Sequence, residues 1–404
     1  MITLHINFKI FLMKKTLALI ALLAVTVFGF AQIQSEIQKA AQSLVNSKKY
    51  ESAFTLLDKY DPDNKIPEIL LMKEDIVLNY YVSSLMHRAF ALKDLEKNES
   101  IMDYRGQNGT FSMFFLPVDS LLLDLLSTDP SNCGLHKGLA CYYNEVMNSY
   151  GNLWLKSSEE VSSLFEEHSN MAISGGCADY DTYFNLGIFH LSSERFHDAV
   201  YPLSKAVELD PKNPDAHYDL AYALFDTLRD KALEHAKTAL NLYKDSEMKA
   251  DAAFMVGSLL IDDNNKDAIK YLELSDKLYP NYHHTLSKLL YLYLTTGNKK
   301  AEKTATRLLN ISPESPTIYD MLEWEYTSSG KSDELVTFYE NQLKNFKDNK
   351  KVTGNLYFYI AKNCMTKDKE KAKLYFLKAK ETFKEVFDKD HYVFETIDSV
   401  LKEL

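Results

Sequence analysis

A repeat in the second half of the chain constrains its fold more than any other feature of the sequence. From Tyr180 onward, apolar residues recur with helical spacing in successive pairs of segments. Each pair has one lead apolar residue in its first segment, and successive lead residues are 34, 36, 33, 33 and 38 positions apart. These lead residues are Leu186, Leu220, Val256, Leu289, Leu322 and Ile360. A chance helical bundle would not hold one period over five steps, so the pattern predicts a stacked array over 178–385.

The residues within each repeat point to a known family. The clearest unit has an aromatic residue, then Leu-Gly, and later Ala, Leu, Ala and Pro, at Tyr183, Leu186, Gly187, Ala199, Leu203, Ala206 and Pro211. This order resembles the tetratricopeptide repeat (TPR) of about 34 residues. The resemblance covers a little over half of the chain. It implies an all-α, right-handed superhelical solenoid of helix-turn-helix units, whose first helices line a concave groove.

Small residues in the repeat have a physical role, because they let two helices approach closely. They stand after the lead residue and late in the second helix, at Gly187, Ala221, Gly257, Ala206, Ala239 and Ser275. Two units depart from this pattern. The fourth has Leu290 after its lead residue, and the fifth has Glu323 there and Leu335 in place of the second-helix Ala. We expect these two helix pairs to pack less closely than the others.

The first half of the chain matches the repeat less well. We expect TPR-like helices over 32–97, including one or two long helices over 66–97, and TPR-like helix pairs over 117–177. Residues 98–116 interrupt the pattern with turn residues and an apolar run, which predicts a loop or insertion. Such a segment either packs back on the solenoid or acts as a lid or self-ligand.

The chain end predicts a capping helix within 386–404. Phe394, Ile397 and Leu401 fall on one face of a helix there. Such a helix covers the last repeat with its apolar face and turns its polar face to water.

Residues 1–31 have the pattern of an export signal. Lys14 and Lys15 precede an apolar run over 17–30, which ends near the small residues Gly29 and Ala31. The run is too short to span a bilayer as a helix. We expect Met13 to be the true start and Gln32 to be the first mature residue, with no membrane insertion after removal of the signal. The signal resembles those of Bacteroidetes-type bacteria, which implies a periplasmic, secreted or outer-membrane-associated protein.

Composition and charge exclude some partners. The chain carries a formal charge of −11, and 46% of its residues are hydrophobic, enough to bury a core. Without residues 1–31, which hold three Lys and no acid, 43 basic and 57 acidic residues leave −14. A negative field repels phosphate, so we expect no nucleic-acid partner and no anionic membrane surface.

The first helices carry aromatic residues where the TPR resemblance implies a groove. We predict a peptide-binding groove lined by Phe184, Tyr218, Tyr222, Phe254, Tyr291, Trp324 and Phe358. The alternative is that these rings belong to the core between helices. Phe225 and Ile188 occupy similar positions and are the ones most expected to be core. A contiguous exposed apolar patch of this kind would mark an interaction site.

Motifs for catalysis or metal binding do not occur in the sequence. There is no His-Glu-x-x-His zinc motif, no phosphate-binding Gly-rich loop and no Gly-x-Ser-x-Gly elbow. We therefore expect no enzyme activity, no cofactor and no metal. Of the four cysteines, Cys133 and Cys177 precede neighbouring first helices and are a candidate disulfide, although sequence alone leaves the connectivity open. Cys141 and Cys364 have the pattern of small core residues.

These observations favour a non-enzymatic adaptor or scaffold of the bacterial cell envelope that binds a protein or peptide in its groove. One alternative is a glycan-binding envelope protein with an aromatic platform. Another is an enzyme whose site lies in 98–135 or in the groove, which a buried cluster of acid and His would indicate.

Overall fold

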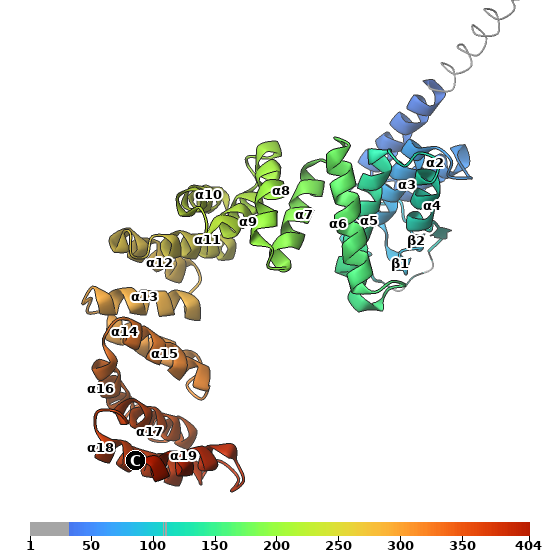
Figure 1. Cartoon of the computed structure of the whole chain (residues 1–404). Helices are drawn as coiled ribbons and strands as arrows, with labels where there is room; N and C mark the ends of the chain where they lie inside the picture. Colours follow the sequence, from blue (N-terminus) through green and yellow to red (C-terminus); the bar gives the residue numbers. More distant parts are fainter. Residues whose placement is uncertain (1–31, 108, 110) are drawn as a thin grey trace, which may run out of the picture. The chain divides into compact units, whose positions relative to one another are not determined.

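A computed structural model describes residues 32–107, 109 and 111–404. The predicted signal peptide, the start at Met13 and the cleavage after Ala31 lie outside these residues. The chain divides into two compact units, Met1–Ser192 and Ser193–Leu404. Figure 1 shows their helices and strands in chain order.

Unit 1 combines helices with a small sheet. A helix covers residues 32–46. It is followed by α2 (Tyr50–Tyr60), α3 (Pro67–Tyr80), β1 (Ser83–Leu85), β2 (Ala89–Ala91), η1 (Ile101–Asp103), β3 (Met113–Phe115), α4 (Val118–Leu126), α5 (Cys133–Tyr150), η2 (Gly151–Leu153), α6 (Ser158–Ser174) and α7 (Tyr180–Ser192). The strands form an antiparallel sheet in the order β1-β2-β3, with Phe90 opposite Ser84 and Phe114.

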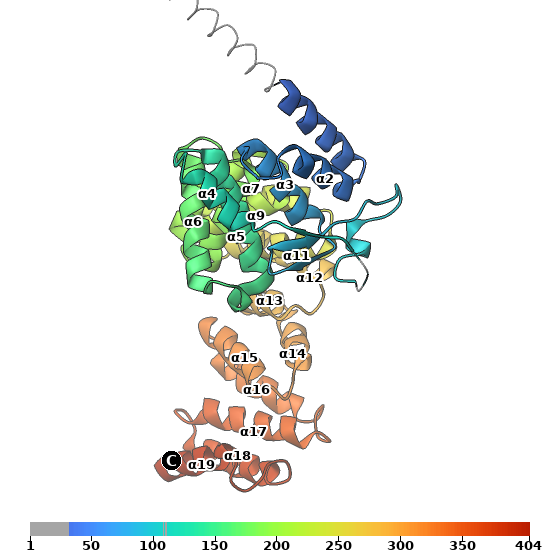
Figure 2. The same ribbon diagram turned by 90° about the vertical axis from the view of Figure 1, so that its right-hand side faces the viewer.

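The prediction of long helices over 66–97 is wrong after Tyr80. The chain there forms β1 and β2, joined by a turn in which Met86 and His87 have φ of 52° and 48°. Neither is a usual turn residue, and contacts from α5 and from the residue that follows η2 hold the turn. Trp154 Nε1 donates to the Met86 carbonyl at 3.0 Å, and the Tyr142 hydroxyl donates to the His87 carbonyl at 3.0 Å. Figure 2 shows the strands beside α5. The predicted loop over 98–116 contains η1 and β3, so it completes this sheet.

Unit 2 contains only helices among its elements. They are α8 (Phe196–Leu209), α9 (Pro214–Leu224), α10 (Arg229–Leu242), α11 (Ser246–Leu259), α12 (Asn265–Leu278), α13 (His283–Thr295), α14 (Ala301–Ile311), α15 (Pro316–Ser328), α16 (Ser332–Gln342), α17 (Lys350–Cys364), α18 (Lys369–Phe383) and α19 (Tyr392–Glu403). Each helix packs mainly on its neighbours in sequence, which is the arrangement of an all-α TPR solenoid.

Small residues set the spacing of these helices. A Cβ atom added to Gly257 of α11 would lie 2.6 Å from Leu272 Cγ of α12. Ala232, Ala236 and Ala239 of α10 are completely buried. The pairs α13/α14 and α15/α16, where Leu290, Glu323 and Leu335 replace small residues, pack less closely than α11/α12, as the sequence predicts.

The chain end forms the expected helix. In α19, Ile397 is fully buried and Phe394 is 9% exposed. Both pack in one cluster with Phe376 and Phe383 of α18. The apolar face of α19 therefore covers the last helix pair.

Candidate functional site

Three of the aromatic residues predicted for the groove lie around one cavity in unit 2. The cavity has a volume of about 480 Å³. It is lined by first helices α9, α11 and α13, together with the start of α10 and the residues after α11. The lining residues are Tyr218, Tyr222, Phe225, Arg229, Phe254, Met255, Ser258, Ile261, Asp262 and Lys288. The structure thus brings Tyr218, Tyr222 and Phe254 together.

The starts of α9 and α11 are fixed by side-chain caps. Asn213 Oδ1 accepts hydrogen bonds from the backbone N–H groups of Asp215 and Ala216, at 3.0 and 3.3 Å. Asp245 Oδ1 accepts from those of Glu247 and Met248, at 2.9 and 3.0 Å. Each cap satisfies donors that a helix start leaves without partners. The caps therefore fix the residues at which α9 and α11 begin, the two helices that carry Tyr218, Tyr222 and Phe254.

Arg229 lines the cavity and binds the chain at the end of α11. Its guanidinium donates to the carbonyls of Leu259 and Ile261 at 2.7 and 2.8 Å, and it lies 3.3 Å from a carboxylate oxygen of Asp263. A cation at these carbonyls also complements the negative C-terminal end of α11. The repeat pattern gives no sign of Arg229 and Lys288, because neither belongs to the aromatic pattern and charged residues on helices are common.

The rings around the cavity are only partly covered. Tyr222 is 48% exposed, and its ring centroid lies 5.6 Å from that of Phe196, edge to face. Tyr218 and Phe254 are half-buried. Partly exposed aromatic rings on a concave surface match the composition of binding surfaces better than that of a closed core.

Burial raises the pKa values of two ionisable groups at or near the cavity. Burial, and then the charge of Asp215, raises the pKa of Asp219 on α9 to about 7. Burial raises the pKa of the Tyr218 hydroxyl as well, with a further contribution from the carboxylates of Asp251 and Asp219. At neutral pH the Tyr218 hydroxyl is therefore a neutral hydrogen-bonding group.

The other predicted groove residues lie elsewhere. Tyr291 is half-buried and interacts with Asp262, which lines the cavity. Trp324 on α15 is 70% exposed. Phe358 on α17 packs edge to face on Phe376, 5.6 Å away, and so contributes to packing between helices. Phe184 belongs to unit 1, where its ring stacks on Tyr180.

Two residues expected to be core are not fully buried. Phe225 lines the cavity and is half-buried, because it follows α9 at the point where the chain turns towards α10. Ile188 on α7 is 36% exposed.

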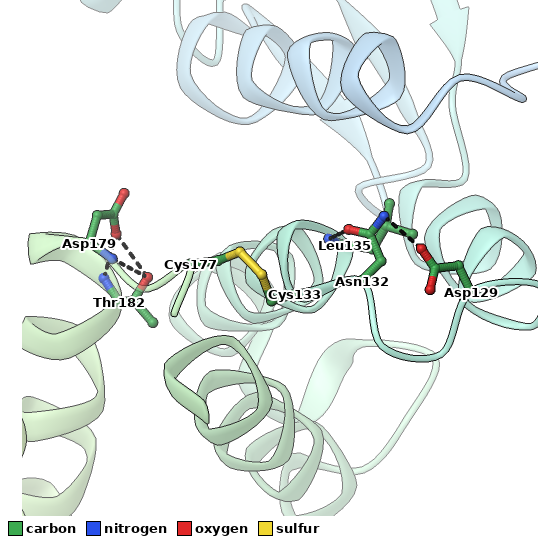
Figure 3. Close-up of a disulfide and its surroundings, with 7 residues drawn as sticks. All are labelled: Asp129, Asn132, Cys133, Leu135, Cys177, Asp179 and Thr182. Atoms are coloured by element: carbon green, nitrogen blue, oxygen red, sulfur yellow. Dashed lines mark hydrogen bonds between the residues drawn. A yellow bond between two sulfur atoms is a disulfide. The ribbon is translucent and has the colours of Figure 1, made fainter. Parts of the chain in front are cut away.

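A disulfide joins Cys133, at the start of α5, to Cys177, in the segment that leads into α7. This is the candidate pair, and its Cα atoms are 5.6 Å apart. Figure 3 shows it between two helix caps. Asn132 Oδ1 accepts from the Leu135 N–H, and Asp179 Oδ1 accepts from the Thr182 N–H at 3.1 Å. Gly175 makes room, since a Cβ there would lie 2.3 Å from Cys133 Cβ.

The remaining cysteines and a histidine cluster do not form a reactive site. Cys364 is buried, as predicted, but the prediction that Cys141 is a core residue is wrong, because Cys141 is exposed on α5. Desolvation by the surrounding chain nevertheless raises the pKa of the Cys141 thiol to about 12. The His87 ring lies 2.9 Å from Ser84 Oγ and 3.4 Å from Glu145 Oε1, an acid and His cluster of the kind that would indicate an enzyme. However, His87 is 1% exposed and packs against Tyr150, so a substrate has no access to it. The cluster holds the β1–β2 turn against α5.

Neither a membrane-spanning helix nor a cluster of metal-binding side chains occurs in the described part of the chain. No helix in residues 32–107, 109 and 111–404 is both long and apolar enough to cross a bilayer. Within the same residues, no group of three or more His, Cys, Asp or Glu side chains is arranged to hold a metal ion.

Comparisons with known proteins identify the repeat. A family model described as "TPR repeat" matches residues 190–227. None of the curated proteins compared with the chain matches it.

Several solved structures resemble the chain. A TPR protein from Parabacteroides merdae is 19% identical and has a TM-score of 0.42, with 66% of this chain and 97% of that one covered. YrrB, a TPR protein with an unusual peptide-binding site, is 19% identical with a TM-score of 0.35, covering 42% and 80%. The MamA protein is 23% identical with a TM-score of 0.35, covering 42% and 92%. Similarities of this size carry no information on function.

Proposed function

Since the chain is a tetratricopeptide-repeat protein, we propose that it is a non-enzymatic adaptor of the bacterial cell envelope that binds a peptide segment of a partner protein. Repeats of this family serve in general as scaffolds for protein interactions and are typically non-catalytic. The peptide binds in the cavity between α9, α11 and α13. The observation that carries it is the convergence of the partly exposed rings of Tyr218, Tyr222 and Phe254 on that cavity.

The chemistry of the cavity suits a peptide with an apolar anchor. The three rings offer apolar surface, and Arg229, Lys288 and Asp262 contribute polar groups to the lining. Buried aromatic contacts carry much of the binding energy at protein interfaces, with losses of about 2 kcal/mol or more when a hot-spot residue is truncated. A volume of about 480 Å³ accommodates one or two side chains of a peptide.

The test is capture of partners from envelope extracts by the full chain and by the double variant Tyr222→Ala/Phe254→Ala. Both residues are partly exposed, so the variant should fold and lose the captured protein. The matched control is Tyr392→Ala on α19, which removes an equally large ring that is 70% exposed and outside the cavity. Equal capture by the double variant and the control would exclude this cavity as the binding site.

One observation favours glycan binding as a second candidate. Trp324 presents a large ring that is 70% exposed, and such a ring can stack on a sugar. Pull-down with insoluble polysaccharides separates the two candidates, because Trp324→Ala should abolish glycan retention and leave peptide capture intact.

The proposed location in the cell envelope rests on the export-like pattern of residues 1–31. The Cys133–Cys177 disulfide supports it, because disulfides persist in oxidising compartments such as the periplasm. Fractionation of cells, with sequencing of the mature N-terminus, tests the location. A protein retained in the cytoplasm with an intact N-terminus would exclude it.

A further inference from the structure

Unit 1 contains a second cavity, of about 720 Å³, that the proposed function does not use. Helices α3 and α5, the segment before α7 and the start of α7 form its wall. Its charged groups are Glu74, Asp75, Lys137, Glu145, Asp179 and Asp181, which are five carboxyl groups and one ammonium group. This imbalance gives the cavity an acidic character.

Glu74 is the unusual member of this wall. Its side chain is only 3% exposed, and its Oε1 atom has no hydrogen-bond partner in the part of the chain that the structure describes. A buried polar atom without a partner is costly to the folded state and needs an explanation. A bound ion is one kind of partner that completes the hydrogen bonding of such a group.

Gly138 makes space for the Glu74 carboxyl group. A Cβ atom at residue 138 would lie 2.6 Å from Glu74 Oε2 and 2.6 Å from Leu71 Cδ2. A larger residue in this position of α5 would displace the Glu74 carboxyl group, the Leu71 side chain or both. The glycine therefore lets a carboxyl group stand inside the cavity between two packed helices.

Most of the neighbouring charges interact with other groups, and Asp181 is exposed. Lys137 forms an ion pair with Asp179, so its ammonium group is not directed at Glu74 alone. Asp75 accepts a hydrogen bond from Asn79 Nδ2 at 2.9 Å. Glu145 accepts one from Ser149 Oγ at 3.0 Å. Among these groups, Glu74 is the buried carboxyl group, and its Oε1 atom finds no hydrogen-bond donor among the residues that the structure describes.

We propose that this cavity binds a primary ammonium group, with the Glu74 carboxylate as its counter-ion. An ammonium group supplies three N–H donors, and so it matches a carboxylate that lacks donors. Leu71 and Leu78 line the same cavity and offer contacts to the methylene chain next to the amine. The amine belongs either to a lysine side chain of a bound peptide or to a free alkyl diamine.

Binding of the ammonium group is coupled to a proton. Burial, and then the charge of Asp75, raises the pKa of Glu74 to about 8, although Lys137 lowers it. Without a bound cation, Glu74 is therefore mainly protonated at pH 7. A bound cation favours the carboxylate, so binding releases a proton from Glu74.

Calorimetric titration of the full chain tests the proposal with three probes. These are the peptide acetyl-Gly-Lys-Gly-amide, the same peptide with norleucine in place of lysine, and 1,5-diaminopentane. The lysine peptide or the diamine should bind, and the norleucine peptide should bind at least ten-fold more weakly. Binding of the peptide alone identifies a lysine side chain as the source, and binding of the diamine alone identifies a free amine.

Variants connect the binding to Glu74. Glu74→Gln keeps the shape and removes the charge, so it should weaken binding at least ten-fold and abolish the proton release seen at pH 7 in buffers of different ionisation enthalpy. Gly138→Ala fills the space beside the carboxyl group and should weaken binding as well, which keeps the test valid if Glu74→Gln fails to fold. Glu167→Gln, on the exposed side of α6, is the matched control. Absence of binding by both amines, equal binding of the norleucine peptide, or unchanged binding by a folded Glu74→Gln would overturn the proposal.

Discussion

The Nδ1 atoms of His136 and His168 lie 2.8 Å apart, between the paired helices α5 and α6. His136 Nε2 lies 3.1 Å from the Pro130 carbonyl oxygen, so it carries a proton and donates it. In the neutral pair, His136 Nδ1 then accepts the proton of His168 Nδ1. Unit 2 repeats this arrangement with His217, His235 and the Pro211 carbonyl, at 2.9 and 3.2 Å.

Acidification should therefore destabilise the helix pairs. Burial, and then the charge of His136, lowers the pKa of His168 to about 4. A histidine with a lowered pKa in the folded state contributes stability above its unfolded pKa of about 6.5, and that stability is lost as the pH falls towards 4. The expected loss is on the order of 2–3 kcal/mol.

Urea unfolding between pH 7.5 and 4 measures this loss. His168→Phe keeps a ring that stacks on Tyr143 and removes the titration, so its stability should fall less steeply with pH. His197→Phe, which replaces a fully exposed histidine, is the control and should keep the wild-type slope. An identical slope for His168→Phe would contradict the role of this pair.

The histidine pairs also show what the sequence does and does not reveal. Both first-helix histidines stand seven residues after the Asp of an Asp-Pro-x-Asn segment, at Asp129 and Asp210. That pattern is visible in the sequence. Their partners, His168 and His235, lie 32 and 18 residues further on and are found only once the helices are paired.

The fold of unit 2 was predictable for a related reason. Its helices pack mainly on their neighbours in sequence, so the local period contains most of the information on packing. The sheet of unit 1 was not predictable in this way. Its β1–β2 turn depends on hydrogen bonds from Tyr142 and Trp154, more than fifty residues away, and no turn residue marks it.

Of the two candidate sites, one was predictable from the sequence and the other was not. The repeat pattern indicated Tyr218, Tyr222 and Phe254, because the positions of first helices follow from the period. It gave no sign of the cavity around Glu74, which depends on the contact of α3 with α5 at Gly138. A glycine inside a helix is the one signal in the sequence that pointed to a close approach there.

The Cys133–Cys177 disulfide predicts the thiol count and a gain in stability. Unfolding without reductant should expose two thiols, those of Cys141 and Cys364. For a sequence separation of 44 residues, loop-closure entropy corresponds to about 4 kcal/mol. The double variant Cys133→Ser/Cys177→Ser should lose about this amount in urea unfolding, whereas Cys141→Ser, at an exposed cysteine, keeps the disulfide and serves as the control. Four reactive thiols in the unreduced protein would exclude the disulfide.

Gly257→Ala should loosen the pair α11/α12. The added methyl carbon would lie 2.6 Å from Leu272 Cγ and 3.3 Å from the Ala268 carbonyl oxygen, so one helix must shift. Overpacking of this kind costs about 1–3 kcal/mol. Thermal unfolding measures the cost, with Ser258→Ala on the same helix as a control that adds no atoms. Equal stability of the two variants would mean that the helices do not approach each other at Gly257 as the structure describes.

Ile397→Ala tests whether α19 stabilises the end of the array. Ile397 is fully buried against the cluster that contains Phe376 and Phe383, so truncation removes apolar contacts and leaves a cavity. Such truncations cost about 2–5 kcal/mol. Leu377→Ala on α18 removes a similar side chain that is 46% exposed, and it should change stability by about 0.5 kcal/mol or less. Hydrogen exchange should show the loss of protection first in α18 and α19, because a terminal repeat has neighbours on one side only. If Ile397→Ala and Leu377→Ala unfold alike, α19 does not act as a cap.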